Sequence, residues 1–280
     1  MKATVLLVLL ALSAGSAFSQ PMHGGVTSTK ATRSSAKPSR RAMPMIASQV
    51  GTGEDIITQV ADGGGWRTTI TIINLSQTVD AVFYLNFYGD DGSPTTFNFV
   101  GVEGCPCSYI QGTMSPAASV VVQTAGVGAV TEGWAQFDYF NTSEFVSGFA
   151  VFSNGNGNEA AVPFESDIAG NEILSFDNTN GYGMGVALAN SDALTVTISA
   201  TFRDGSGNVL GTDTFTMDSM THTAFIFAQQ WPFTAGQRGT VYLQPTDSSG
   251  TAFGLAILGL RYTPKGAFTS VTSLQATTLD

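Results

Sequence analysis

The sequence predicts an all-β protein whose body consists of two tandem, immunoglobulin-like β-sandwich modules. Only 11% of the residues are charged, and the body is rich in Gly, Thr, Val and Phe, with turn dipeptides at short intervals. Apolar residues recur at every second position, which is the period of a strand. This pattern occurs twice, in copies of about 110 residues with seven or eight short strands each, as in an immunoglobulin-like sandwich.

The N-terminus has the layout of a secretory signal peptide over residues 1–19. Lys2 precedes an apolar run over residues 3–12, and small residues follow over residues 13–17. Cleavage after Ala17 or after Ser19 would satisfy the requirement for small residues, and we prefer the second, so that the mature chain would begin at Gln20. No later apolar run approaches the ~20 residues that span a bilayer. The expected product is a secreted protein, extracellular or periplasmic, without a transmembrane span.

Residues 20–50 are expected to form a disordered basic arm, because this stretch is rich in Ser, Thr, Ala and Pro and buries too little apolar surface to order itself. Residues 51–280 hold all 21 acids of the chain against five cations, a net charge of −16. This acidic body argues against nucleic acid as a partner. The arm is expected to be a solvated linker, with contact to anionic surfaces as the alternative. It carries five cations and no acid: Lys30, Arg33, Lys37, Arg40 and Arg41.

An internal duplication divides the body into modules at residues 51–168 and 169–280. Residues 65–74 align with residues 181–190 at an offset of 116, and further matches continue after small shifts in offset. The shifts place an insertion near residues 101–113 of the first copy. A repeat this long indicates separate domains and not solenoid units. In both copies one strand has apolar residues at alternate positions, namely Ala81, Phe83, Leu85 and Phe87 in the first and Val196, Ile198, Ala200 and Phe202 in the second.

The first copy is expected to hold eight strands, and a short linker around Asp167 to Asn171 is expected to join the modules. The strands are predicted at residues 55–60, 67–74, 81–88, 95–101, 118–123, 133–140, 146–153 and 160–164.

The segments Val60 to Trp66, Thr68 to Asn74 and Phe87 to Gly92 resemble a group of secreted bacterial β-sandwich repeat proteins that carry an Ala-Asp-Gly-Gly-Gly-Trp sequence. The second copy keeps only Asn178, Gly181 and Tyr182 of that sequence. The group has no assigned activity. The resemblance therefore implies export and fold, and it transfers no catalytic residue.

The two cysteines, Cys105 and Cys107, lie in the insertion of the first copy. In an oxidising compartment we expect them to form a local disulfide. Binding of a metal by this pair is disfavoured, because a zinc site needs a third and a fourth ligand and no cluster of His or Cys supplies them. We therefore expect no metal and no cofactor.

Catalytic residues are not evident in the sequence. His23 lies in the arm, His222 is expected to be a surface residue, and no Gly-x-Ser-x-Gly elbow occurs. The run that starts at Asp204 begins like a calcium loop but lacks its later ligands, so a hairpin turn is expected there. A hydrolase that uses paired carboxylates stays open as an alternative, because such pairs form in space and not in sequence.

Candidate binding residues come from comparing the outward positions of the two copies. Tyr84, Tyr88 and Trp134 of the first copy correspond to Ser199, Arg203 and Thr240 of the second. Contiguous exposed aromatic side chains mark an interface or a binding site. The alternative is that this face packs against the second copy or under the insertion.

The function expected first is that of a non-enzymatic extracellular module pair, used for attachment, matrix structure or protein contact. Carbohydrate binding by the aromatic residues of the first module is the second expectation, since aromatic faces stack on sugar rings. A carboxylate hydrolase comes third.

Overall fold

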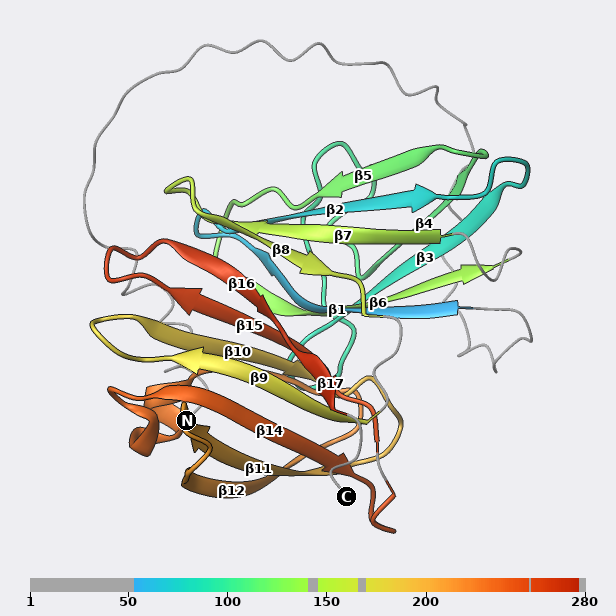
Figure 1. The fold of residues 1–280 in the computed structure, drawn as a ribbon. Coiled ribbons are helices and arrows are strands. Elements are labelled where there is room, and N and C mark those ends of the chain that lie inside the picture. The colour runs from blue at the N-terminus through green and yellow to red at the C-terminus, as the bar shows by residue number, and fades with distance from the viewer. Residues whose placement is uncertain (1–52, 141–145, 166–169, 252, 277–280) are drawn as a thin grey trace.

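The computed structural model describes residues 53–140, 146–165, 170–251 and 253–276, and these residues form an all-β protein with several antiparallel sheets (Figure 1). Module 1 holds β1 (Gly53–Asp62), β2 (Arg67–Asn74), β3 (Ala81–Tyr88), β4 (Tyr109–Met114), β5 (Ser119–Gln123), β6 (Thr131–Phe140), β7 (Val146–Ser153) and β8 (Glu159–Pro163).

Module 2 holds the remaining strands and two short helices. These are β9 (Asn171–Asp177), β10 (Gly183–Ala189), β11 (Val196–Asp204), β12 (Val209–Met217), β13 (His222–Ile226), α2 (Phe227–Gln230), the 3-10 helix η1 (Pro232–Thr234), β14 (Arg238–Thr246), β15 (Ala256–Tyr262), β16 (Phe268–Thr272) and β17 (Leu274–Ala276).

Each module is a sandwich of two sheets, and the two modules share one strand order. The β1 sheet has the order β1-β6-β3-β4 and the β2 sheet β5-β2-β7-β8. The corresponding β9 sheet is β9-β14-β11-β12, extended by β17, and the β10 sheet is β13-β10-β15-β16. In both modules the first two strands lie in opposite sheets, whereas in the immunoglobulin sandwich they share a sheet. The likeness to that fold therefore ends at the two-layer architecture.

The alternating residues predicted for β3 and β11 do point into the sandwich cores. All eight are at most 1% exposed, and β3 and β11 each lie inside their sheets, between two neighbouring strands. The buried row is continuous because successive side chains of a strand point to opposite faces.

One predicted strand, at residues 95–101, is wrong, and β4 was missed within the supposed insertion. Residues 95–101 make only isolated bridges, at Phe97 and Phe99. Both rings are buried in the core of module 1. The chain crosses here from the β1 sheet to the β2 sheet, with Phe97 N–H bonded to Cys107 O and Val100 N–H to Gln123 O. Apolar alternation thus marked a core crossing and not a strand.

The modules are joined through the β10 sheet, whose central strands β10 and β15 are buried on both faces. Met184, Val186 and Leu188 of β10 belong to the core of module 2. Ala187, on the opposite face, belongs to the core of module 1, and side chains of β15 and β16 join it there. β10, β15 and β16 lie against β1 and β8, the two edge strands on one side of the module 1 sandwich (Figure 1). Module 2 therefore covers that open side.

Glu165 ties the two modules by hydrogen bonds at this junction. Its backbone pairs with that of Ile56, and its carboxylate accepts from Thr58 Oγ1 at 2.9 Å and from the Ile257 N–H at 3.0 Å. Burial raises the pKa of Glu165 from 4.5 to about 7, despite these two donors. The predicted linker lies largely outside the described residues, because residues 166–169 are not among them.

We expect stability to fall as the pH rises from about 4.5 to 7. Folded Glu165 keeps its proton in this window while the unfolded chain loses it, so the unfolded state binds fewer protons. Glu54 and Asp55, whose pKa values burial raises to about 7 and about 6, act in the same direction. Glu165→Gln should lessen this loss by about 1–2 kcal/mol, because the amide can still accept from Ile257 and donate to Thr58.

Urea denaturation at pH 5 and pH 8 measures this effect. The matched control is Glu159→Gln, which changes an exposed carboxylate of β8. An equal pH dependence in the native chain and in Glu165→Gln would show that Glu165 does not contribute.

Candidate functional site

The predicted aromatic surface is in large part a module junction. Trp134 is fully buried, it stacks on Tyr88 with 4.7 Å between ring centroids, and its Nε1 donates to Met220 O at 3.2 Å. Its apolar neighbours include Ala189 and Ala256 of module 2. The prediction that Trp134 is exposed is therefore wrong, and the alternative, packing against the second copy, is what the structure has. Alternation identified an outward position but not what covers it.

Tyr84 is the predicted aromatic residue that lies farthest from this junction. It is half-buried on the outer face of the β1 sheet, opposite Asp138 of β6 and Gln111 of β4. Tyr109, which is 45% exposed, lies on the same face. The three predicted residues thus share one sheet face, but module 2 covers the end of it that holds Trp134.

His222 is buried at the junction, which contradicts the expected surface position. Its Nδ1 lies 2.9 Å from Asp90 Oδ1 and its Nε2 lies 3.1 Å from Gln59 Oε1. Both partners belong to module 1. Because both ring nitrogens contact these oxygens, neither is left to activate a serine hydroxyl as a triad would require. His222 links the modules.

Two further sequence features are local loop structures. Cys105 and Cys107 are joined by a disulfide within the segment that precedes β4. Asp204 accepts hydrogen bonds from the N–H groups of Ser206 and Asn208 in the turn between β11 and β12, which is the hairpin expected there. Among the described residues, no group of three or more His, Cys, Asp or Glu is placed to hold a metal ion.

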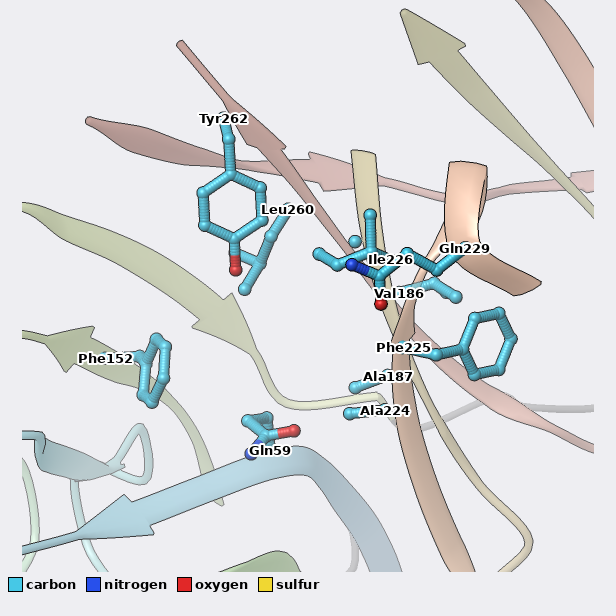
Figure 2. A pocket seen from close by; sticks show the side chains of 11 residues that line it. Gln59, Phe152, Val186, Ala187, Ala224, Phe225, Ile226, Gln229, Leu260 and Tyr262 are labelled. Carbon is cyan, nitrogen blue, oxygen red and sulfur yellow. The ribbon is translucent and has the colours of Figure 1, made fainter. Parts of the chain in front are cut away.

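A narrow apolar cavity lies between the modules, with Gln59 and Phe152 on one side and the β10 sheet on the other (Figure 2). The hydroxyl of Tyr262 is buried beside it without a hydrogen-bond partner in the described structure. Only about 20 Å³ is open to the centre of a water molecule. That space suits about one water. This cavity is a packing gap of the junction, too small for a ligand.

A much larger recess opens in module 2 between β12 and β13, the edge strands of its two sheets. About 290 Å³ is open there to the centre of a water molecule. We call it the β12–β13 recess. It is lined by Phe215, Thr216, Met217, Asp218, Thr221, His222, Thr223, Phe225, Gln230 and Trp231.

Aromatic rings form the inner wall of the β12–β13 recess. The rings of Phe225 and Trp231 meet edge to face with 4.9 Å between centroids, and Phe215 lies 6.2 Å from Trp231. Trp231 is fixed by a hydrogen bond of 2.7 Å from its Nε1 to Asp213 Oδ2. Asp213 also accepts from the Thr214 N–H through its other oxygen, which holds the carboxylate along the β12 edge. The wall is therefore preorganised.

The rim of the β12–β13 recess is polar. Three threonines line it, together with the exposed amide of Gln230 and the exposed carboxylate of Asp218. Neither Lys nor Arg is among the described residues that line it. Such a site suits a neutral ligand that has apolar ring faces and hydroxyl groups, and it disfavours an anion.

Sequence reasoning missed this recess. Phe215 and Phe225 lie on β12 and β13, which correspond to β4 and β5 of the first copy, and Trp231 follows α2. These residues border a recess because β12 and β13, the edge strands of two different sheets, lie close together. No local sequence pattern predicts that proximity.

Comparisons with known proteins found no matching family model, no similar curated protein and no similar solved structure. No helix in the described ranges is long and apolar enough to cross a lipid bilayer.

We expect Trp134→Thr, which installs the residue of the second copy, to lower the free energy of unfolding by about 3–5 kcal/mol, because it leaves a cavity at the junction. Tyr84→Ser, on the open part of the same face, should cost about 1 kcal/mol or less. Urea denaturation of both variants measures the difference. Equal small losses would mean that the contact of Trp134 with module 2 does not stabilise the protein.

Proposed function

We propose that this chain is a secreted, non-enzymatic binding protein and that its ligand is a neutral glycan held in the β12–β13 recess. The observation that carries the proposal is an aromatic-walled recess of about 290 Å³ with a rim of hydroxyl, amide and carboxylate groups. Small-ligand sites combine a concave apolar wall with a few placed polar groups.

The chemistry of a sugar ring matches this lining. The C–H faces of a pyranose pack on aromatic rings such as those of Phe215 and Phe225. Its hydroxyls both donate and accept, as do the threonine hydroxyls and the Gln230 amide, while Asp218 accepts. The described lining contains neither Lys nor Arg, which favours a neutral sugar over an acidic one.

Rigidity supports binding at this recess. Trp231 is held by Asp213 on one side, and His222, which lines the recess, is held by Asp90 and Gln59 of module 1 on the other. A site whose walls are already fixed loses little conformational entropy when a ligand binds.

The lining favours binding over hydrolysis. Glycoside hydrolysis uses two carboxyl groups that flank the scissile bond. Among the described residues that line the recess, Asp218 is the only one with a carboxylate. Extracellular attachment or matrix contact then follows from glycan recognition.

Phe225→Leu should weaken glycan binding about 3- to 10-fold, because it keeps apolar volume but removes a ring face for stacking. Gln230→Ala should weaken binding by a similar factor through loss of a hydrogen bond. A glycan array of neutral oligosaccharides identifies the ligand, and isothermal titration calorimetry then measures the variants.

The matched control is Tyr242→Leu, which removes an aromatic residue from β14 outside the recess and should leave affinity unchanged. Absence of any neutral glycan ligand would overturn the proposed function. Binding that Tyr242→Leu weakens and the recess variants do not would overturn the site.

A further inference from the structure

We propose that the basic segment 30–41 of this chain docks, within the same molecule, on the outer face of the β1 sheet. This inference does not depend on the glycan proposal, because it concerns a different surface. The arm that precedes module 1 would then occupy a sheet face that module 2 covers only at one end.

The outer face of the β1 sheet carries rows of side chains across its strands. One row consists of Glu54, Asp138, Tyr84 and Gln111, and the next of Ile56, Gln136, Asn86 and Tyr109. Cross-strand partners lie on the same face with their Cβ atoms about 5 Å apart. The face therefore combines tyrosine rings, amides and carboxylates.

Of the carboxylates of this face, Asp138 is positioned by hydrogen bonds, and neither it nor Glu54 forms an ion pair among the described residues. Asp138 accepts from Asn86 Nδ2 at 2.9 Å and from Gln136 Nε2 at 3.0 Å. Glu54 lies directly opposite Asp138, and like charges so placed repel each other. Burial, followed by the charges of Asp138, Asp192 and Asp55, raises the pKa of Glu54 to about 7. A cation that binds between these carboxylates would relieve their mutual repulsion.

No cation of the described structure meets this need. Neither ion pair found among the described residues involves the β1 sheet face. The five cations of the body are placed on other sheets or in a loop of module 2: Arg67 on β2, Arg203 on β11, Arg238 on β14, Arg261 on β15 and Lys265 after β15. The remaining cations that the mature chain would carry are those of the arm.

The arm is attached beside this face. It leads into β1 at Gly53, next to Glu54. Arg41 precedes Glu54 by 13 residues, which span at most about 45 Å when extended. The face is four strands wide, about 15 Å at the usual strand spacing. The tether therefore allows every cation of segment 30–41 to reach the tyrosines and carboxylates.

The expected contact is weak, local and dependent on salt. Arginine guanidinium groups pair with carboxylates and stack on tyrosine rings. Each exposed ion pair contributes little by itself, because solvent screens it. A tether supplies an effective concentration of about millimolar, which suffices for a weak contact to form within one molecule. Screening at high salt should release it.

A spin label on the arm tests the proposal in the full mature chain. Ser35→Cys carries a nitroxide label, and NMR relaxation then reports which residues approach it. At low salt we expect strong broadening of the Tyr84, Asn86 and Tyr109 resonances. Tyr242, on the corresponding sheet of module 2, should keep its intensity. High salt should restore the broadened resonances, as should the double variant Glu54→Gln with Asp138→Asn.

A second variant controls for non-specific broadening by the nitroxide label. Replacing the five arm cations by Gln should restore the same resonances without changing the spectrum of module 2. Equal broadening of Tyr242 and Tyr84, or none at all, would overturn the proposal. Broadening that appears only between a spin-labelled molecule and a separate isotope-labelled molecule would overturn it as well, because the contact would then join two chains.

Discussion

The covering of one open side of module 1 by the β10 sheet is the constraint on which the rest of the structure depends. A sandwich of two open sheets leaves edge strands that pair readily with other chains. Here β1 and β8 are such edges, and module 2 packs against them. On its facing side β10 carries the small residues Gly185 and Ala187, and a Cβ at Gly185 would lie 3.1 Å from the ring of Tyr262 in the same sheet.

The packing of the two modules against each other buries several polar groups. His222 of module 2 contacts Asp90 and Gln59 of module 1, and Glu165 contacts the backbone of β15 at Ile257. Each buried polar group needs a partner, because an unpaired one costs its full desolvation penalty. These hydrogen bonds and the shared apolar packing favour the relative position of the two modules that the structure shows.

The two modules share a strand order, but the chain covers the core differently between the edge strands β4 and β5 of module 1 than between the edge strands β12 and β13 of module 2. This difference produces the β12–β13 recess. In module 1 the segment before β4 crosses from one sheet to the other and inserts Phe97 and Phe99 into the core. In module 2 the hairpin from β11 to β12 is direct, and Phe227 of α2 and Trp231, between α2 and η1, fill the core. The space left between the edge strands β12 and β13 is the recess with its aromatic wall.

The sequence by itself determined the strand class, most strand positions and the inward residues of β3 and β11, because a strand's period of two is local and a sandwich buries one face of each strand. It did not determine β4, since the apolar residues of a core crossing alternate as those of a strand do. Only the tertiary structure decided that Trp134 and His222 are buried and that Phe215, Phe225 and Trp231 border a recess. These outcomes depend on which surfaces meet across sheets and modules, and the pattern within one strand carries no information about that.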